Sequence, residues 1–366
     1  MKIVFLTNSI GFGGAEKMMA FVANGLCKKN HNVTILNFDS VAKEVNASLQ
    51  SFDNRIKVIP YFGVKEGKIS SLKKLAFAFN NISRNNADII IGFTAFPNFV
   101  ARIVGSLKGI PSIMSERGNP FITIDKTNFH SRLELAIINQ SKGGVFQIAG
   151  AKEFYGEKLQ KRAVIIPNPI FVNEPISTIP IEKRQKTVVS VGRLDNYQKR
   201  YDIMIKAFVL FVNKFPDWTL KIYGDGPDKL KIQSWIIEEN MSGKIRLMGV
   251  TKNPIRDICQ DGIFLITSDF EGISNSLLEA MAIGLPCVST DSTPGGARML
   301  IQDGRNGLLA PIAEPERIAD AMCKFADNPQ FAQSCGEKAR DVIKRFDAAK
   351  IIDRWDEYIK LVADKK

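Results

Sequence analysis

Short apolar runs rich in β-branched residues recur along the chain, and each ends in a polar or glycine-bearing turn. Such runs predict buried strands of a parallel sheet. The first run, residues 2–7, is followed by a glycine turn at 11–14, a helical stretch at 15–26 and a second run at 31–38. This order is that of a right-handed βαβ unit. Further strands are expected at residues 56–59, 88–93, 112–115 and 164–169, and then at 187–191, 220–223, 245–248, 262–267 and 286–290.

A polar, charged and proline-containing stretch at residues 171–186 interrupts this pattern and suits a linker. The α/β pattern restarts after it, so we predict two Rossmann-like domains, one at 1–170 and one at 171–347. The last stretch, 348–362, places apolar residues at helical spacing and predicts an amphipathic helix. Ligands of such sheets bind beyond the carboxyl ends of the strands, so a cleft between the two domains is the expected site.

Composition narrows the class of protein. The chain has 366 residues, of which 45% are hydrophobic and 24% charged. These values are typical of soluble globular proteins and exclude a disordered chain, a collagen-like fibre and a coiled coil. No stretch reaches the roughly 18 uninterrupted apolar residues of a membrane-spanning helix, and the first apolar run is too short for a signal peptide, so we expect a cytoplasmic protein. The five cysteines, an odd number without closely paired spacing, and the two histidines indicate neither a disulfide framework nor a metal site.

The positive charge is concentrated in the first domain. Residues 1–172 carry 22 Lys and Arg against 11 Asp and Glu, whereas the rest of the chain carries 28 against 27. An excess of this kind indicates an acidic partner. Residues 65–84, with Lys73 and Lys74, mix apolar and basic side chains, which fits either a surface helix with a buried stripe or a patch that rests on an anionic membrane. Nucleic acid is not predicted, because no DNA- or RNA-binding motif accompanies the charge.

A glycine turn opens the first predicted helix. Gly13 and Gly14 follow the first strand, and glycine lets the backbone approach a ligand closely. A helix start also offers N–H groups and the positive end of its dipole to an anion. Glu16 stands where a dinucleotide-binding motif would need its third glycine, so no nicotinamide cofactor is predicted. The turn is therefore either a phosphate-binding turn or a purely structural one.

The second domain places cations after its first strand. Arg193 and Lys199 lie in the segment between that strand and the next helix. Together they could neutralise a diphosphate and stabilise charge on a departing nucleoside diphosphate; on their own they could equally be solvated loop cations. Gly224 begins a further glycine turn after the following strand.

Two carboxylates follow the strand predicted at 262–267. Glu271 is expected in a loop and Glu279 in the helix after it, a little over two turns apart on one side of the site. Backbone N–H groups at the helix start can hold phosphate. The residues expected there are Ile273, Ser274 and Asn275.

These residues belong to longer motifs that resemble those of family 4 glycosyltransferases, the retaining, nucleotide-sugar-dependent enzymes of GT-B fold. The resemblance covers nearly the whole chain. It rests on GGAE at 13–16, GRLD at 192–195 with the downstream Lys199, GDGP at 224–227, EGISNSLLEAMAIGLP at 271–286, GGAR at 295–298 and DGRNGLL at 303–309. In that fold the last helix, here 348–366, crosses back to join the first domain, whereas without the resemblance it could equally be a core helix of the second domain.

The resemblance implies a role for each matching residue. Arg193 and Lys199 would bind the donor diphosphate in place of a metal, so that no cofactor is expected. Glu279 would hold the ribose, and Glu271 would contact the transferred sugar and support an oxocarbenium-like transition state. The remaining residues implied to bind substrate are Gly13, Gly14, Gly224, Ile273, Ser274 and Asn275.

Two departures from the family pattern stand out. Many members carry a histidine after the fourth strand of the first domain, but the segment 115–120 has none. Glu116 and Arg117 are expected either near the sugar or in a structural or acceptor-side role. Met299 stands where the family often has a glutamate, which affects the predicted contacts of the donor loop.

The function implied is retaining transfer of a hexose or N-acetylhexosamine from a nucleoside-diphosphate sugar, with UDP favoured over GDP. The acceptor would be a hydroxyl of a glycan or lipid-linked glycan in cell-surface polysaccharide or lipopolysaccharide synthesis. Such an enzyme would be cytoplasmic, with a peripheral position on the inner face of the membrane if Lys73 and Lys74 dock there. The alternatives are a GT-B nucleotide-sugar epimerase, which the paired glutamates disfavour, and a non-catalytic nucleotide-sugar-binding protein.

Overall fold

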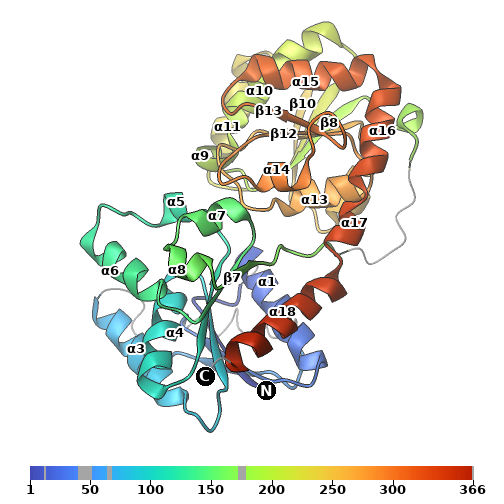
Figure 1. Cartoon of the computed structure of the whole chain (residues 1–366). Helices are drawn as coiled ribbons and strands as arrows, with labels where there is room; N and C mark the ends of the chain where they lie inside the picture. The colour runs from blue at the N-terminus through green and yellow to red at the C-terminus, as the bar shows by residue number, and fades with distance from the viewer. Residues whose placement is uncertain (12–13, 40–51, 64–67, 172–178, 365–366) are drawn as a thin grey trace. The chain divides into compact units, whose positions relative to one another are not determined.

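A computed structural model describes residues 1–11, 14–39, 52–63, 68–171 and 179–364. The chain divides into two compact units (Figure 1). Unit 1 comprises Met1–Asn168 together with Ala348–Lys366, and unit 2 comprises Pro169–Asp347. Each unit contains one parallel sheet covered by helices, so each is an α/β layer structure of the predicted class.

The strands of unit 1 are β1 (Lys2–Thr7), β2 (Asn32–Asn37), β3 (Lys57–Pro60), β4 (Ile89–Phe93), β5 (Ser112–Glu116), β6 (Gly143–Phe146) and β7 (Ala163–Ile165). Within the described residues they form one sheet of order β3-β2-β1-β4-β5-β6-β7, in which all paired strands are parallel. The order reverses between β1 and β4, which makes that place the topological switch point of a doubly wound sheet. The helices are α1 (Gly14–Lys28), α3 (Lys68–Asn81), α4 (Ala95–Lys108), α5 (Pro120–Thr123), α6 (Phe129–Ile138), α7 (Ala149–Glu153), α8 (Glu157–Gln160) and α18 (Ala348–Asp364).

Both faces of this sheet are buried under helices. Phe5 points into a core shared with α1 and α18, whereas its neighbour Leu6 points into the opposite core, which α3 and α4 cover. Successive side chains of a strand face opposite sides, so strands covered on both sides have nearly continuous apolar runs. This burial explains the uninterrupted apolar runs of the sequence.

The last helix, α18, completes the core of unit 1. Trp355 is fully buried and stacks on Phe93 of β4, with ring centroids 6.0 Å apart and an interplanar angle of 15°. His31, directly before β2, places Nε2 2.8 Å from the Asp356 carboxylate. The apolar face of this amphipathic helix therefore packs on strands whose residues lie more than 200 positions earlier in the chain.

The strands of unit 2 are β8 (Thr187–Val191), β9 (Thr219–Tyr223), β10 (Ile245–Gly249), β11 (Ile263–Ile266), β12 (Cys287–Thr290) and β13 (Leu308–Ala310). Within the described residues their order is β10-β9-β8-β11-β12-β13, again parallel and again reversing beside the first strand of the unit. The helices are η1 (Ile181–Lys183), α9 (Asn196–Lys199), α10 (Tyr201–Lys214), α11 (Lys229–Glu238), α12 (Pro254–Ile258), α13 (Asn275–Ala282), α14 (Gly296–Leu300), α15 (Pro315–Asp327), α16 (Pro329–Ala339) and α17 (Val342–Arg345).

The predicted strands correspond to strands of the two sheets, with small shifts at their ends. Two strands, β6 and β13, were not predicted. The cysteines are free thiols; Cys259 is half-buried and the other four are buried, as expected of small apolar side chains. Among the helices that the structure describes, none is long and apolar enough to cross a membrane.

Candidate functional site

The charged residues predicted in the second domain gather at the switch point of unit 2. β8 ends at Val191, two residues before Arg193, and β11 ends at Ile266, five residues before Glu271. Because β8 and β11 are parallel neighbours, both segments leave the same edge of the sheet. That edge, at the point where the strand order reverses, is where doubly wound sheets bind their ligands.

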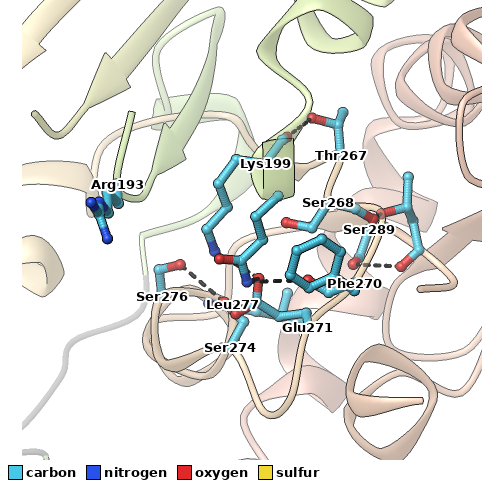
Figure 2. Close-up of polar contacts among 12 residues, drawn as sticks. Arg193, Lys199, Thr267, Ser268, Phe270, Glu271, Ser274, Ser276, Leu277 and Ser289 are labelled. Carbon is cyan, nitrogen blue, oxygen red and sulfur yellow. Dashed lines mark hydrogen bonds and ion pairs between the residues drawn. The ribbon is translucent and has the colours of Figure 1, made fainter. Parts of the chain in front are cut away.

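Lys199 and Glu271 form an ion pair at this edge. Lys199 Nζ lies 2.7 Å from Glu271 Oε2, and the two side chains are 16% and 17% exposed. Gln198 Nε2 donates to the same carboxylate oxygen at 3.2 Å. Figure 2 shows the lysine pointing to the glutamate from the neighbouring segment, with Arg193 to one side of the pair. The pair is thus a partly buried, directional contact, in contrast to the loose ion pairs of exposed surfaces.

Lys199 is held by a short helix and by the end of β11. The sequence placed it in a loop, but it is the last residue of α9, and its N–H donates to Asp195 O at 2.9 Å. Thr267 Oγ1 donates to Lys199 O at 2.9 Å and contacts Arg200 O at 3.1 Å. This hydroxyl fixes the backbone that carries the ammonium group.

Arg200 is a positioning residue that the sequence analysis missed. It adopts a left-handed backbone with φ of 51°, which is uncommon for a residue other than glycine, and this ends α9. Its guanidinium bridges two carboxylates, Asp269 at 2.6 Å and Asp202 at 3.0 Å. Asp269 lies two residues before Glu271, so Arg200 ties the loop of the glutamate to the segment of the lysine. Only the position of Arg200 beside Lys199 could have indicated this role.

The loop that carries Glu271 is held by close backbone packing. Glu271 N–H donates to Thr293 O at 2.9 Å, and Phe270 forms an isolated parallel bridge with Thr293. Gly296, the first residue of α14, lies against Gly272: a Cβ added at Gly296 would be 1.6 Å from Gly272 O. A side chain at position 296 would therefore displace the loop.

The helix after this loop begins as predicted. Ser274 is the N-cap of α13, and its Oγ accepts the N–H of Leu277 at 3.3 Å. Ile273 and Ser274 are buried and Asn275 is exposed at the first helical position. Glu279 is half-buried in the second turn, so the two glutamates of the motif lie in a loop and in a helix as the sequence analysis expected.

The two other predicted residues of unit 2 are Arg193 and Gly224. Arg193 is exposed, and its carbonyl accepts the hydroxyl hydrogen of Tyr201 at 3.2 Å. Gly224 has a φ of 146°, and a Cβ there would be 1.8 Å from Gly192 O. Packing between the ends of β8 and β9 is thus sufficient to require this glycine, whether or not it contacts a substrate.

The glycine turn of unit 1 is only partly described, because Gly13 lies outside the described residues. Gly14 is exposed at the start of α1, and a Cβ there would meet nothing within 4 Å. Packing therefore does not require a glycine at this position. Thr94, after β4 at the switch point of this sheet, has a φ of 75° and accepts a hydrogen bond from Asn8 Nδ2 at 3.3 Å. A β-branched residue in that conformation is strained, and such strain clusters at functional sites; sequence patterns do not reveal it.

Glu116 and Arg117 are buried within unit 1. The Glu116 carboxylate accepts hydrogen bonds from the N–H groups of Arg117 and Gly118, both at 2.9 Å, and from the Tyr155 hydroxyl at 2.6 Å. The Arg117 guanidinium lies over the ring of Trp355 at 5.1 Å. Burial lowers the pKa of Arg117 to about 9, with Glu116 acting in the opposite direction. Of the roles considered for Glu116 and Arg117, these contacts support a structural one.

No three His, Cys, Asp or Glu side chains among the described residues come together as a metal site would require. The idea that Arg193 and Lys199 act in place of a metal stays a prediction.

Comparison with known proteins gives consistent results. Residues 173–342 match the family model described as Glycosyl transferases group 1. An uncharacterized glycosyltransferase of Haemophilus influenzae is 25% identical and covers 97% of this chain and 98% of its own. The GalNAc-α-(1→4)-GalNAc-α-(1→3)-diNAcBac-PP-undecaprenol α-1,4-N-acetyl-D-galactosaminyltransferase of Campylobacter jejuni is 25% identical and covers 100% and 99%.

Solved structures show the same fold. Anabaena HepE in complex with UDP has a TM-score of 0.81 at 18% identity, covering 98% of this chain and 100% of its own. The lipopolysaccharide outer core galactosyltransferase WaaB has a TM-score of 0.80 at 21% identity, covering 98% and 99%. At these identities the likeness concerns the fold, and the family match and the curated relatives supply the activity. Residues 173–342 therefore form a domain of the group 1 glycosyltransferases, and the chain is a glycosyltransferase with a GT-B fold.

Proposed function

We propose that this glycosyltransferase transfers a sugar from a UDP-sugar to a hydroxyl of a glycan or lipid-linked glycan in bacterial surface-polysaccharide synthesis, with retention of anomeric configuration. The observation that carries the proposal is the Lys199–Glu271 pair at the switch point of unit 2. It supplies a cation for a diphosphate and a carboxylate for a sugar at the edge where such sheets bind ligands.

The donor would be held by groups with separate tasks. The exposed Arg193 guanidinium and the Lys199 ammonium would bind the diphosphate. Lys199 has three N–H donors, so it can donate to a diphosphate oxygen and keep its contact with Glu271 Oε2. The capped start of α13 adds the positive end of a helix dipole beside them. Half-buried Glu279, one turn farther along that helix, would accept hydrogen bonds from the ribose hydroxyls.

These groups suit a transfer in which the leaving group departs early. Negative charge grows on the diphosphate as the glycosidic bond breaks, and preorganised cations stabilise that charge without a reorganisation cost. Glu271, held by Gln198 and Lys199, would face the positive charge that develops on the sugar ring. Attack of the acceptor hydroxyl on the face that the diphosphate leaves would retain the anomeric configuration.

Support for the donor and the acceptor comes from relatives. Anabaena HepE was crystallised with UDP and with UDP-glucose. The Campylobacter jejuni relative is named as acting on an undecaprenol-diphosphate-linked glycan. The positive charge of the first 172 residues fits an acceptor that carries phosphate or a membrane that carries anionic lipid.

Donor binding tests the proposal directly. We expect UDP and its sugars to raise the melting temperature of the protein more than GDP or ADP do, because binding to the native state stabilises it by mass action.

Glu279→Ala should weaken the stabilisation by UDP and lower sugar transfer by about 10²-fold, the usual scale for losing one preorganised group. Turnover measured with and without a lipid-linked acceptor separates transfer from epimerisation. A variant that binds UDP and turns over like the wild type would contradict the role of Glu279, and the absence of turnover with every donor would contradict the transfer reaction.

Membrane docking is a second expectation. Leu72 and Phe79 of α3 are 67% and 39% exposed beside the exposed Lys73, so the apolar positions of this helix are not confined to a buried stripe. Such a surface suits the headgroup region of an anionic membrane. In liposome flotation, Lys73→Gln/Lys74→Gln should reduce recovery with phosphatidylglycerol vesicles and leave recovery with phosphatidylcholine vesicles unchanged. Equal flotation of the wild type with both vesicle types would refute docking through charge.

A further inference from the structure

Unit 1 contains a cavity at the edge of its sheet where the strands begin. The cavity has a volume of about 540 Å³. Asp88, Pro111 and Lys142 line it, and each directly precedes a strand, β4, β5 and β6 respectively. The last turn of α4 forms another wall. Ligands of doubly wound sheets bind at the opposite, carboxyl edge, so this cavity is separate from the place where a glycosyl donor or acceptor would react.

The cavity is lined by more positive than negative charge. Three of its lining residues are cations, Arg84, Arg102 and Lys142, whereas its acid is Asp88. The Asp88 carboxylate accepts the backbone N–H of Lys2 at 2.7 Å. Across the described residues, no carboxylate lies within ion-pair distance of Arg102 or Lys142. Within the described part of the chain, these two cations therefore have no carboxylate partner.

Arg84, an exposed residue of the cavity wall, is oriented by a backbone carbonyl. Its Nε donates to Lys108 O at 2.8 Å. Gly109, which has a φ of 63° at the end of α4, makes room for it: a Cβ there would be 2.1 Å from Arg84 Nη2. This hydrogen bond uses one of the five N–H donors of the guanidinium. It orients the group and leaves the other donors for a ligand.

Among the described residues, the side chains of Arg102 and Lys142 form no hydrogen bond with the carbonyls at the end of α4. Two of these carbonyls accept backbone N–H groups instead: Gly109 N–H donates to Ser106 O, and Ile110 N–H donates to Gly105 O at 2.8 Å. Arg102 is half-buried, and burial together with the nearby positive charge of Arg162 lowers its pKa. Burial and a like charge thus disfavour the charged form of Arg102, and an anion in the cavity would oppose both effects.

We propose that this cavity binds a phosphate group, with Arg84, Arg102 and Lys142 as its donors. Guanidinium groups bind phosphate oxygens in a bidentate manner and a lysine adds a point charge. The phosphate could belong to a free anion or to the headgroup of an anionic lipid, because both present the same acceptor oxygens. The proposal does not depend on the identity of the donor sugar or on the roles given to Lys199 and Glu271.

Two kinds of variant separate a built site from general positive charge. Arg102→Gln/Lys142→Gln removes two of the three donors. Ser106→Phe keeps every charge but places a ring in the cavity, since Ser106 lines it, is exposed and bonds only within its own helix, to Arg102 O. Lys73→Gln/Lys74→Gln is the matched control, because it removes the same net charge elsewhere in unit 1. Thermal melts of each variant establish that the fold is intact before binding is compared.

Calorimetric titration with inorganic phosphate and with pyrophosphate at constant ionic strength, on the full chain saturated with UDP, provides the first readout. We expect the double variant and Ser106→Phe to bind at least about 10-fold more weakly than the wild type, the range for losing hydrogen bonds to a charged group, and the control to bind normally. Flotation with phosphatidylglycerol vesicles provides the second readout, in which Ser106→Phe is compared with the wild type.

The outcomes assign the source of the phosphate or reject the site. Cavity-dependent binding of free phosphate identifies a soluble anion, and cavity-dependent flotation without binding of free phosphate identifies a lipid headgroup. If the folded cavity variants match the wild type in both assays, or if the control loses phosphate binding as they do, the proposal is wrong.

Discussion

Replacing Lys199 with alanine is expected to lower sugar transfer by about 10²- to 10³-fold, the usual range for removing one preorganised charge from a transition state. Lys199 Nζ lies 2.7 Å from the Glu271 carboxylate in a partly buried position, so its charge is oriented before the donor binds. Without the ammonium, the departing diphosphate loses a counter-charge and Glu271 loses a hydrogen-bond donor. The measurement is the initial rate of transfer with the donor that stabilises the protein most.

A lysine elsewhere in unit 2 provides the control for this experiment. Lys186 is exposed and contacts Asp217 at 3.3 Å across the surface, and exposed pairs of this kind contribute little to stability. Lys186→Ala should therefore transfer sugar like the wild type.

Glu271→Gln should lower transfer as Lys199→Ala does. Gln198 can still donate to the amide oxygen of the new side chain, but a neutral group cannot stabilise the developing positive charge of the sugar. Near-wild-type rates for both Lys199→Ala and Glu271→Gln would remove the basis for the proposed active site.

The positions of the charged residues could be inferred from sequence because they depend on strand ends. Arg193 follows β8 and Glu271 follows β11, and an apolar run that ends in a charged turn is visible without coordinates. The contacts that orient these residues could not be inferred. Arg200 links the two segments through Asp269, and no spacing rule predicts an ion pair between residues 69 positions apart.

Strand β6 illustrates why part of the fold was not predicted. It begins with Gly143 and Gly144, and glycine in a strand lacks the side chain that would pack there. The structure shows what these glycines permit: a Cβ at Gly143 would be 2.6 Å from the Tyr358 hydroxyl, and Gly144 N–H donates to that hydroxyl at 2.9 Å. The residue that explains the strand is contributed by α18, more than 200 positions later, so local sequence could not identify it.

The glycines of the motifs also differ in a way that only coordinates reveal. A Cβ at Gly14 would meet nothing within 4 Å, whereas one at Gly224 or Gly296 would lie less than 2 Å from a backbone oxygen. Packing thus explains Gly224 and Gly296. Gly14 is explained instead by contact with a ligand or by its position at a helix start.

Gly296→Ala is expected to have the second large effect, and through backbone geometry instead of charge. The added Cβ would lie 1.6 Å from Gly272 O, 2.4 Å from Gly272 C and 3.1 Å from Glu271 O. These atoms belong to the backbone of the loop and cannot rotate away as a flexible side chain could, so the loop or α14 must shift. Overpacking of this kind costs about 1–3 kcal/mol of stability, and a displacement of roughly 1 Å in a catalytic group can cost about 10²-fold in rate.

The measurement compares transfer rate and melting temperature in Gly296→Ala and in Gly243→Ala. Gly243 lies between α11 and β10 in the same unit, is exposed, and a Cβ there would meet nothing within 4 Å, so its substitution should change neither quantity appreciably. If Gly296→Ala is assayed well below its melting temperature and still transfers sugar at the wild-type rate, the position of the Glu271 loop does not limit transfer. A rate that falls by about 10²-fold while most molecules remain folded would instead show that the close approach of Gly272 and Gly296 sets the position of Glu271, because the substitution introduces no charge and removes none.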